Sequence, residues 1–276
     1  MNKEKEQEIE SFNLSEEVLD EIMTAKKIFY SLPSPLETAM IIKTAGAEYN
    51  EELLNSVDNV NNYTTNKSMA LNLGIYTTDM SYASLFDQTQ STISFMNISK
   101  KLADGLGILD AIDDNTIERL EENINNREVI MDIISETFMS SSSYLKENER
   151  APVATIVLVG GWIEGLYIAT QLVGEGGIEN NKLVDRVVEQ KLSFEILEKL
   201  LSQYKYDEDI QSLTAQMQDL RNVLKKVEIT HTANKTSKDN ETKVTTLKSK
   251  ISYQITPEVF KELTSVVETL RSNFIL

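Results

Sequence analysis

The chain has 276 residues, of which 41% are hydrophobic, and it carries a formal net charge of −17 and no cysteine. This length is enough to bury one sizeable core or two smaller ones. The negative charge repels phosphates and anionic lipid, so binding to nucleic acid or to a membrane surface is not expected. Without cysteine, the sequence excludes disulfides, thiolate catalysis and cysteine-ligated metals.

The chain contains only 4 prolines and 10 glycines. A β-sandwich or an α/β fold of this length would need more residues that break helices and form turns, so the composition favours long helices. The sequence therefore predicts an all-α fold, an irregular bundle of about eight to ten helices that forms a single domain over residues 15–276. Residues 1–14 are acidic and predict a flexible lead-in or tether.

The first helix is predicted from Ser15 to just before Leu32-Pro33, because apolar residues recur there at helical spacing. Ser34 opens a capping box with a proline at the first helical position, and Gly46 is expected just after the end of that second helix. The next predicted elements are a short turn of helix over 50–54, a polar loop over 55–62, a helix from about Thr65 to Leu73 that ends at Gly74, and a separate helix capped by Thr77 or Thr78.

The middle of the chain predicts three further helices. The first runs from about Gln88 to Leu106 and is closed by Gly105 and Gly107. The second is the longest, running without a break from a cap at Asp113, Asp114 or Asn115 to about Lys146. The third covers residues 153–173 and is strongly apolar. Glycines end it from Gly174 onward.

Residues 179–204 and 207–227 predict two amphipathic helices. The apolar seam of the second is under three heptads long, too short to require an intermolecular coiled coil, so we expect the two helices to form an antiparallel hairpin. Residues 228–255 depart from helical spacing, and we expect an extended excursion or a short hairpin there. A final helix should begin at Thr256-Pro257-Glu258.

The segment Ala151 to Val173 is long enough to cross a bilayer on paper. However, Glu164 lies near its centre, and a central carboxylate costs several kcal/mol in lipid. We therefore interpret the segment as a buried core helix and expect no transmembrane span.

The motifs mostly exclude chemistry. The single histidine, His231, falls in a predicted loop or edge strand, so no metal site with two or more histidines can form. The sequence contains no metalloprotease or di-iron motif and no phosphate-binding loop, because its glycine pairs follow helices rather than strands. We assign no catalytic residue, no metal ligand and no cofactor from the sequence.

Glu164 is the most informative single residue, because it lies in the middle of the most apolar segment, beside Trp162 and near Tyr167. A buried carboxylate must pair, hydrogen-bond or stay protonated. The favoured interpretation is a structural anchor bonded to a Tyr, Thr or Lys of a neighbouring helix. The alternative is a group that contacts a ligand or handles a proton in a cavity. Nearby glycines, including Gly160 and Gly165, would allow close helix packing there, or close approach of a ligand.

A second candidate group consists of Tyr76, Asp79 and Tyr82, which share one helical face. They predict either an edge of the core with hydrogen-bonded tyrosine hydroxyls or a polar binding groove. With Glu164, Trp162 and Tyr167, these three residues complete the set of candidate binding residues.

Several segments resemble an uncharacterised family of helical, lipoprotein-like exported proteins from Bacteroidetes bacteria: Tyr30 to Glu37, Ala45-Gly46, Tyr49-Asn50, Ala70 to Tyr76 through Asp79, and Val244 to Lys250. The resemblance covers most of the chain from about residue 28. It implies no established activity, cofactor or catalytic residue. It does imply an envelope location, with residues 1–14 as a tether after a lipidated cysteine outside the given sequence.

The sequence therefore predicts a non-enzymatic binding or structural protein of the bacterial cell envelope, whose partner is an unidentified protein or small molecule. If the natural gene carries no export signal, the expected location is the cytoplasm. The alternative is a helical small-molecule-binding protein or an unrecognised enzyme that uses Glu164.

Overall fold

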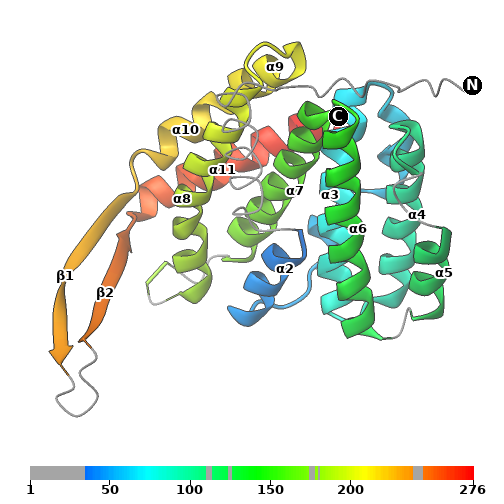
Figure 1. The fold of residues 1–276 in the computed structure, drawn as a ribbon. Coiled ribbons are helices and arrows are strands. Elements are labelled where there is room, and N and C mark those ends of the chain that lie inside the picture. Colours follow the sequence, from blue (N-terminus) through cyan, green and yellow to red (C-terminus); the bar gives the residue numbers. More distant parts are fainter. Residues whose placement is uncertain (1–34, 110–113, 124–125, 174–177, 180, 239–244) are drawn as a thin grey trace, which may run out of the picture.

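The computed structural model describes residues 35–109, 114–123, 126–173, 178–179, 181–238 and 245–276. Within these residues the chain forms ten α-helices, two short 3-10 helices and one two-stranded hairpin (Figure 1). The predicted all-α bundle is confirmed, and the extended excursion is an antiparallel hairpin. The lead-in at 1–14 and the helix predicted from Ser15 lie outside the described residues.

The first half of the chain contains α2 (Pro35–Thr44), the 3-10 helices η1 (Glu51–Leu53) and η2 (Val57–Asn62), α3 (Asn66–Leu85), α4 (Thr89–Gly105), α5 (Asp114–Glu122) and α6 (Arg127–Glu147). The second half contains α7 (Ala151–Leu172), α8 (Lys182–Gln203), α9 (Glu208–Gln216), α10 (Gln218–Leu224), β1 (Glu228–Lys238), β2 (Thr245–Gln254) and α11 (Pro257–Ile275).

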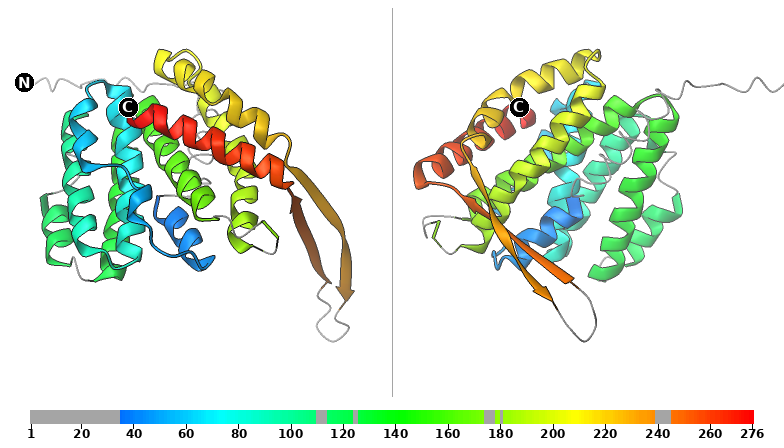
Figure 2. Two further views of the ribbon diagram at one scale, coloured as in Figure 1. Left: turned by 180° about the vertical axis from the view of Figure 1, so that it is seen from behind. Right: turned by 60° about the vertical axis from the view of Figure 1, so that its left-hand side comes forward.

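At the centre of the fold, α3 packs along α7. Helix α7 lies between two groups of helices, α3 to α6 on one side and α8, α10 and α11 on the other (Figures 1 and 2). Two glycines allow the two backbones to touch. A Cβ built on Gly74 would lie 2.0 Å from the carbonyl oxygen of Val157, and one built on Gly160 would lie 2.0 Å from that of Leu71. Both distances are far below a normal contact, so these positions require glycine. Close helix packing, the interpretation favoured for Gly160, is therefore confirmed.

The prediction that a helix ends at Gly74 is wrong, because α3 continues through Gly74 to Leu85. The glycine lies where α7 crosses, and burial of α3 on almost every side outweighs the weak helix propensity of one residue. The start of α3 follows the expected chemistry, since Thr65 caps it in a reciprocal capping box with Ser68.

Two predicted helices are interrupted. The long helix expected up to Lys146 is divided into α5 and α6, and Asn126 caps the second piece through a bond from the Val129 amide. The helix expected over 207–227 is divided at the buried Met217 into α9 and α10. Neither break contains Gly or Pro, so composition gave no sign of them.

The predicted antiparallel hairpin of residues 179–204 with 207–227 is present. Lys191 Nζ donates to the carbonyl oxygen of Val227 at 2.6 Å, and Arg221 pairs with Glu198. Helix α11 returns across this pair and packs against both α10 and α7. The hairpin of β1 and β2 projects away from the helices (Figures 1 and 2).

Helix α7 is the one helix in the described part of the chain that is long and apolar enough to cross a membrane. Its most apolar window is 83% buried inside the protein. This is the arrangement expected of a core helix, the interpretation that the central Glu164 favoured.

Candidate functional site

Glu164 lies at the centre of a buried ion pair. Its side chain is 0% exposed, and that of Arg271, from α11, is 8% exposed. Arg271 donates from Nε to one carboxylate oxygen and from one terminal nitrogen to the other, each at 3.0 Å. This two-bond geometry is the strongest form of the interaction. The predicted anchor is therefore present in the structure, but its partner is an arginine and not the expected Tyr, Thr or Lys.

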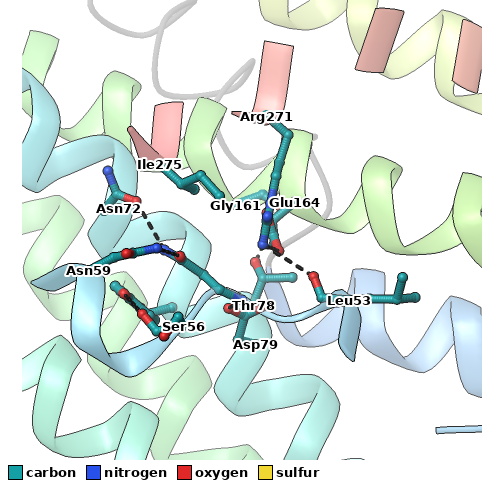
Figure 3. A network of polar contacts seen from close by, with 12 residues as sticks. Leu53, Ser56, Asn59, Asn72, Thr78, Asp79, Gly161, Glu164, Arg271 and Ile275 are labelled. Carbon is teal, nitrogen blue, oxygen red and sulfur yellow. Dashed lines mark hydrogen bonds and ion pairs between the residues drawn. The ribbon is translucent and has the colours of Figure 1, made fainter. Parts of the chain in front are cut away.

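Two further contacts hold the guanidinium in place. Arg271 donates to the backbone carbonyl of Leu53 at 3.2 Å (Figure 3). Its charged carbon lies 4.7 Å from the ring centre of Tyr167. A cation over an aromatic face is attracted by the ring electrons. Tyr167, a candidate from the sequence, thus belongs to the same cluster as Glu164 and supports its partner.

Asp79 from α3 is the second buried acid of the cluster and is 0% exposed. Burial raises the pKa of its carboxyl well above the ordinary value of 3.8, and the nearby negative charge of Glu164 raises it further. Arg271 and a bond from the Asn55 amide act in the opposite direction but are outweighed. For Arg271, burial alone would lower the pKa of the guanidinium, yet Glu164 raises it on balance. The cluster thus contains two acids and one permanent cation.

A proton on Asp79 resolves this excess of negative charge. One Asp79 oxygen accepts from the Asn55 amide at 3.1 Å, while the other is buried with no hydrogen-bond partner among the described residues. Two ionised carboxylates repel each other, but a protonated Asp79 can donate to Glu164. The raised pKa of Asp79 favours a neutral acid next to the charge-balanced ion pair.

A network of amides extends from Asp79 to the end of α11 (Figure 3). The Asn55 side chain donates to the Tyr63 hydroxyl at 3.0 Å and to the Asn72 side chain at 3.3 Å. Asn72 donates to the carbonyl of Phe274 at 2.8 Å, and Tyr63 donates to that of Ile275 at 3.2 Å. These bonds satisfy the last carbonyls of α11, which have no partner within their own helix.

The face of α3 that carries Tyr76, Asp79 and Tyr82 is covered by residues 48–56. The Tyr76 hydroxyl donates to the carbonyl of Ser56 at 2.7 Å. The Tyr82 hydroxyl donates to the carbonyl of Glu48 at 3.0 Å and accepts from the Asn50 amide at 3.0 Å. All three side chains are fully buried. The geometry is that of a core edge with hydrogen-bonded hydroxyls.

Trp162 is separate from the cluster, although it is only two positions from Glu164. Its indole nitrogen donates to Gln190 of α8 at 3.1 Å, and its ring lies 5.7 Å from that of Phe194. Residues two apart on a helix point to different sides. The structure therefore brings together Glu164, Tyr167 and Asp79 and places Trp162 in the interface with α8.

Sequence reasoning missed Arg271, although a signal was present. Arg271 follows Leu270 and lies four residues after Val267 and three before Phe274, all buried residues on the inner face of α11. An arginine on the apolar face of one helix and a glutamate in the middle of another are natural partners. Because the pair is buried and joined by two hydrogen bonds, its arrangement is that of a structural tie between α7 and α11.

The sequence also gave no sign of an apolar cavity of about 80 Å³ that lies between helices of the first group and α7. Four helices contribute stripes at helical spacing, and Ile108 and Leu120 complete the wall. The stripes are Leu73, Thr77 and Met80 of α3, Met96, Ser99 and Lys100 of α4, Ile134, Thr137, Phe138, Ser141, Ser142 and Leu145 of α6, and Ala154 and Val157 of α7. Each stripe alone reads as an ordinary core face, so only their assembly creates the space.

This cavity is suited to a small apolar ligand. A cavity needs roughly 10–15 Å³ to hold one water molecule, so this volume would hold several. Its wall is almost entirely apolar, which water does not favour. By contrast, Glu164 does not line this cavity. The described residues also contain no group of three or more side chains suited to hold a metal ion.

Comparisons of the chain with protein-family models, with curated proteins and with solved structures find no match. The resemblance to exported Bacteroidetes proteins consequently stays a prediction. The functional argument rests on the geometry of the cavity and of the buried cluster.

Proposed function

We propose that this protein is a non-catalytic binding protein that holds a small apolar molecule in the cavity between α3, α4, α5, α6 and α7. The observation that carries the proposal is the combination of an open volume with an apolar wall. Protein interiors are normally close-packed, and empty space forfeits dispersion contacts. A ligand that fills the space would restore them.

In this proposal, the buried cluster around Glu164 and Arg271 has a structural role. Glu164 is fully buried and each of its oxygens already accepts a bond from Arg271, so a substrate cannot reach it from solvent. An enzyme built on Glu164 would require the ion pair to open first. The cluster instead ties α11 to α7 and α3, and so holds one wall of the helical core in place.

The test is thermal unfolding in the presence of small neutral apolar probes, with xenon and benzene as the first two. A probe that binds only the folded state at 100 times its Kd should stabilise it by about 2.7 kcal/mol. Ser142→Leu should abolish the shift, because Ser142 is buried and lines the cavity. Ser140→Leu is the matched control, since Ser140 is exposed on the same helix. Absence of any shift in the wild type would refute the proposal.

We further propose that the protein acts in the bacterial cell envelope, as a lipoprotein whose signal is not part of the given sequence. The support is the sequence resemblance and the acidic stretch at residues 1–14. The intact mass of the protein purified from its native cells tests this proposal. A lipid-modified residue ahead of residue 2 is expected, and an unmodified Met1 would place the protein in the cytoplasm.

A further inference from the structure

The hairpin of β1 and β2 leaves the helices as a two-stranded arm (Figures 1 and 2). A two-stranded hairpin alone is marginally stable in water, because it needs a third strand or a packed helix for independent stability. Within the described residues each strand is also an edge, whose outer backbone donors and acceptors meet no third strand. An arm of this kind is expected to gain support from contacts with another molecule.

The outer part of this hairpin is basic, although the chain as a whole is acidic. The two strands carry four lysines against one acid, Glu228, a net charge of +3, whereas the whole chain has a net charge of −17. All four lysines lie beyond the pair of His231 and Ile251 in the register, and Lys235 is directly opposite Lys248. Like charges directly opposite each other destabilise a hairpin. An acidic surface laid against the two lysines would relieve this repulsion.

An open groove at the base of the same hairpin is acidic. Its volume is about 820 Å³, and it lies between the first half of α8 and the start of β1. Val184 and Val188 of α8 line it and are buried. The lysine that lines it, Lys226, pairs with Glu262 at 2.6 Å, so the charge of this lysine is balanced. Exposed acids line the groove from both sides: Glu179, Asp185 and Glu228. Negative charge thus lies at one end of the hairpin and positive charge at the other.

We propose that the protein self-associates through its hairpins, with the outer basic part of each hairpin lying in the acidic groove of a second copy. Two hairpins that lie side by side in opposite directions bring the lysines of each copy to the acids of the other. The resulting dimer has twofold symmetry, the commonest symmetry of protein oligomers. This proposal is independent of the apolar cavity and of its ligand.

The dimensions and charges of the chain are compatible with this contact. A strand rises about 3.3 Å per residue, so the 11 residues of β1 span about 36 Å, enough for two antiparallel hairpins to reach each other's bases. Two chains of net charge −17 repel each other, but at 0.15 M ionic strength the Debye length is about 8 Å. Charges that meet directly in the groove therefore outweigh those on the rest of the two surfaces. A second copy also fills the groove, which an unrelated acidic partner would leave empty.

The experiment measures the mass of the full chain by light scattering at about 0.15 M ionic strength, with two charge-reversed variants. Lys235→Glu with Lys248→Glu makes the hairpin acidic, and Asp185→Lys with Glu228→Lys makes the groove basic. The wild type should have twice the chain mass of 31.2 kDa. In each variant alone the dimer Kd should rise at least about tenfold, because like charges then meet across the interface. An equal mixture of the two variants should restore the dimer, since each hairpin then meets a groove of opposite charge.

Restoration of the dimer on mixing also shows that both variants fold. Lys199→Glu with Lys205→Glu is the matched control, because both lysines are exposed away from the groove and the net charge changes as in the hairpin variant. This control should stay dimeric.

A wild type that remains monomeric at about 1 mM chain would overturn the proposal. So would a dimer that neither variant weakens, or a mixture that stays monomeric. Binding of polyglutamate to a monomeric wild type through Lys235 and Lys248 would overturn it in favour of a different acidic partner. The apolar cavity is tested separately by xenon and benzene, so the two proposals can fail independently.

Discussion

Replacing Glu164 with Gln removes the anion that pairs with Arg271, and the structure predicts that Asp79 takes over its role. In the native protein the negative charge of Glu164 helps to raise the pKa of Asp79, which favours its protonated form. In the variant, burial still raises the pKa of Asp79 and the positive charge of Arg271 still lowers it. The negative charge of Glu164, which raises this pKa in the native protein, is absent. Asp79 should therefore ionise in the variant and neutralise the buried guanidinium.

This replacement of Glu164 by Asp79 as the counterion of Arg271 sets the expected losses of unfolding free energy. Removing one partner of a buried ion pair costs about 3–5 kcal/mol of unfolding free energy when the other charge is left uncompensated. With Asp79 as a substitute, Glu164→Gln should cost only about 1–3 kcal/mol, since part of that penalty is recovered. Asp79→Asn should cost at most about 1 kcal/mol at neutral pH, because it replaces a neutral acid by a neutral amide of the same shape. The double variant should lose the full 3–5 kcal/mol or so.

The assay is urea unfolding followed by the fluorescence of Trp162, the single tryptophan, which is buried against Phe194. The double-mutant cycle should give a coupling energy of about 1–3 kcal/mol. Glu198→Gln is the control, because its pair with Arg221 is partly exposed and should be worth at most about 1 kcal/mol. If Glu164→Gln lost as much unfolding free energy as the double variant, Asp79 would not be acting as the substitute counterion, and the reasoning would be refuted.

Three further predictions follow from the same structure. Gly160→Ala should destabilise the protein by about 1–3 kcal/mol or more through overpacking, while Gly105→Ala, whose added Cβ meets only the flexible Met69 side chain, should be neutral or stabilising in thermal unfolding. Because the pKa of Asp79 is raised on folding, its contribution to stability is complete below pH 3.8 and is lost as pH rises through the folded value. The stability of Asp79→Asn relative to the wild type should therefore increase as pH rises above 3.8 in a titration of unfolding free energy. Thr256→Ala should cost about 1 kcal/mol in urea unfolding, because it removes the cap of α11, and an unchanged midpoint would contradict this.

Helical spacing was enough to predict most of the fold, because each helix buries a stripe against its neighbours. It failed at Gly74, where a glycine inside α3 is required by contact with another helix and not by a change of direction. It also failed at Met217, where a buried apolar residue joins two helices. Local sequence cannot distinguish these cases, since the deciding atoms lie on segments far along the chain.

The candidate site could be predicted only in part, for the same reason. Glu164 stood out because a charge in an apolar segment is anomalous by itself. Arg271 was the corresponding anomaly on α11. Predicting its pair with Glu164 would have required the assumption that α7 and α11 are neighbours in the fold. Ser99 carries no such signal, because a serine on a helix is ordinary until four separate helices leave it facing an empty space.

The tie between Glu164 and Arg271 has a consequence for how the protein is made. The two residues are 107 positions apart, so Glu164 leaves the ribosome well before its partner has been added to the chain. Until then, α7 carries an acid that cannot be buried as an anion without a large penalty. The growing chain is thus held short of its final packing, with an apolar helix exposed to aggregation or to assisting chaperones. The core can therefore finish packing only after α11 has been synthesised. A stall in translation before α11 should leave an incompletely packed bundle.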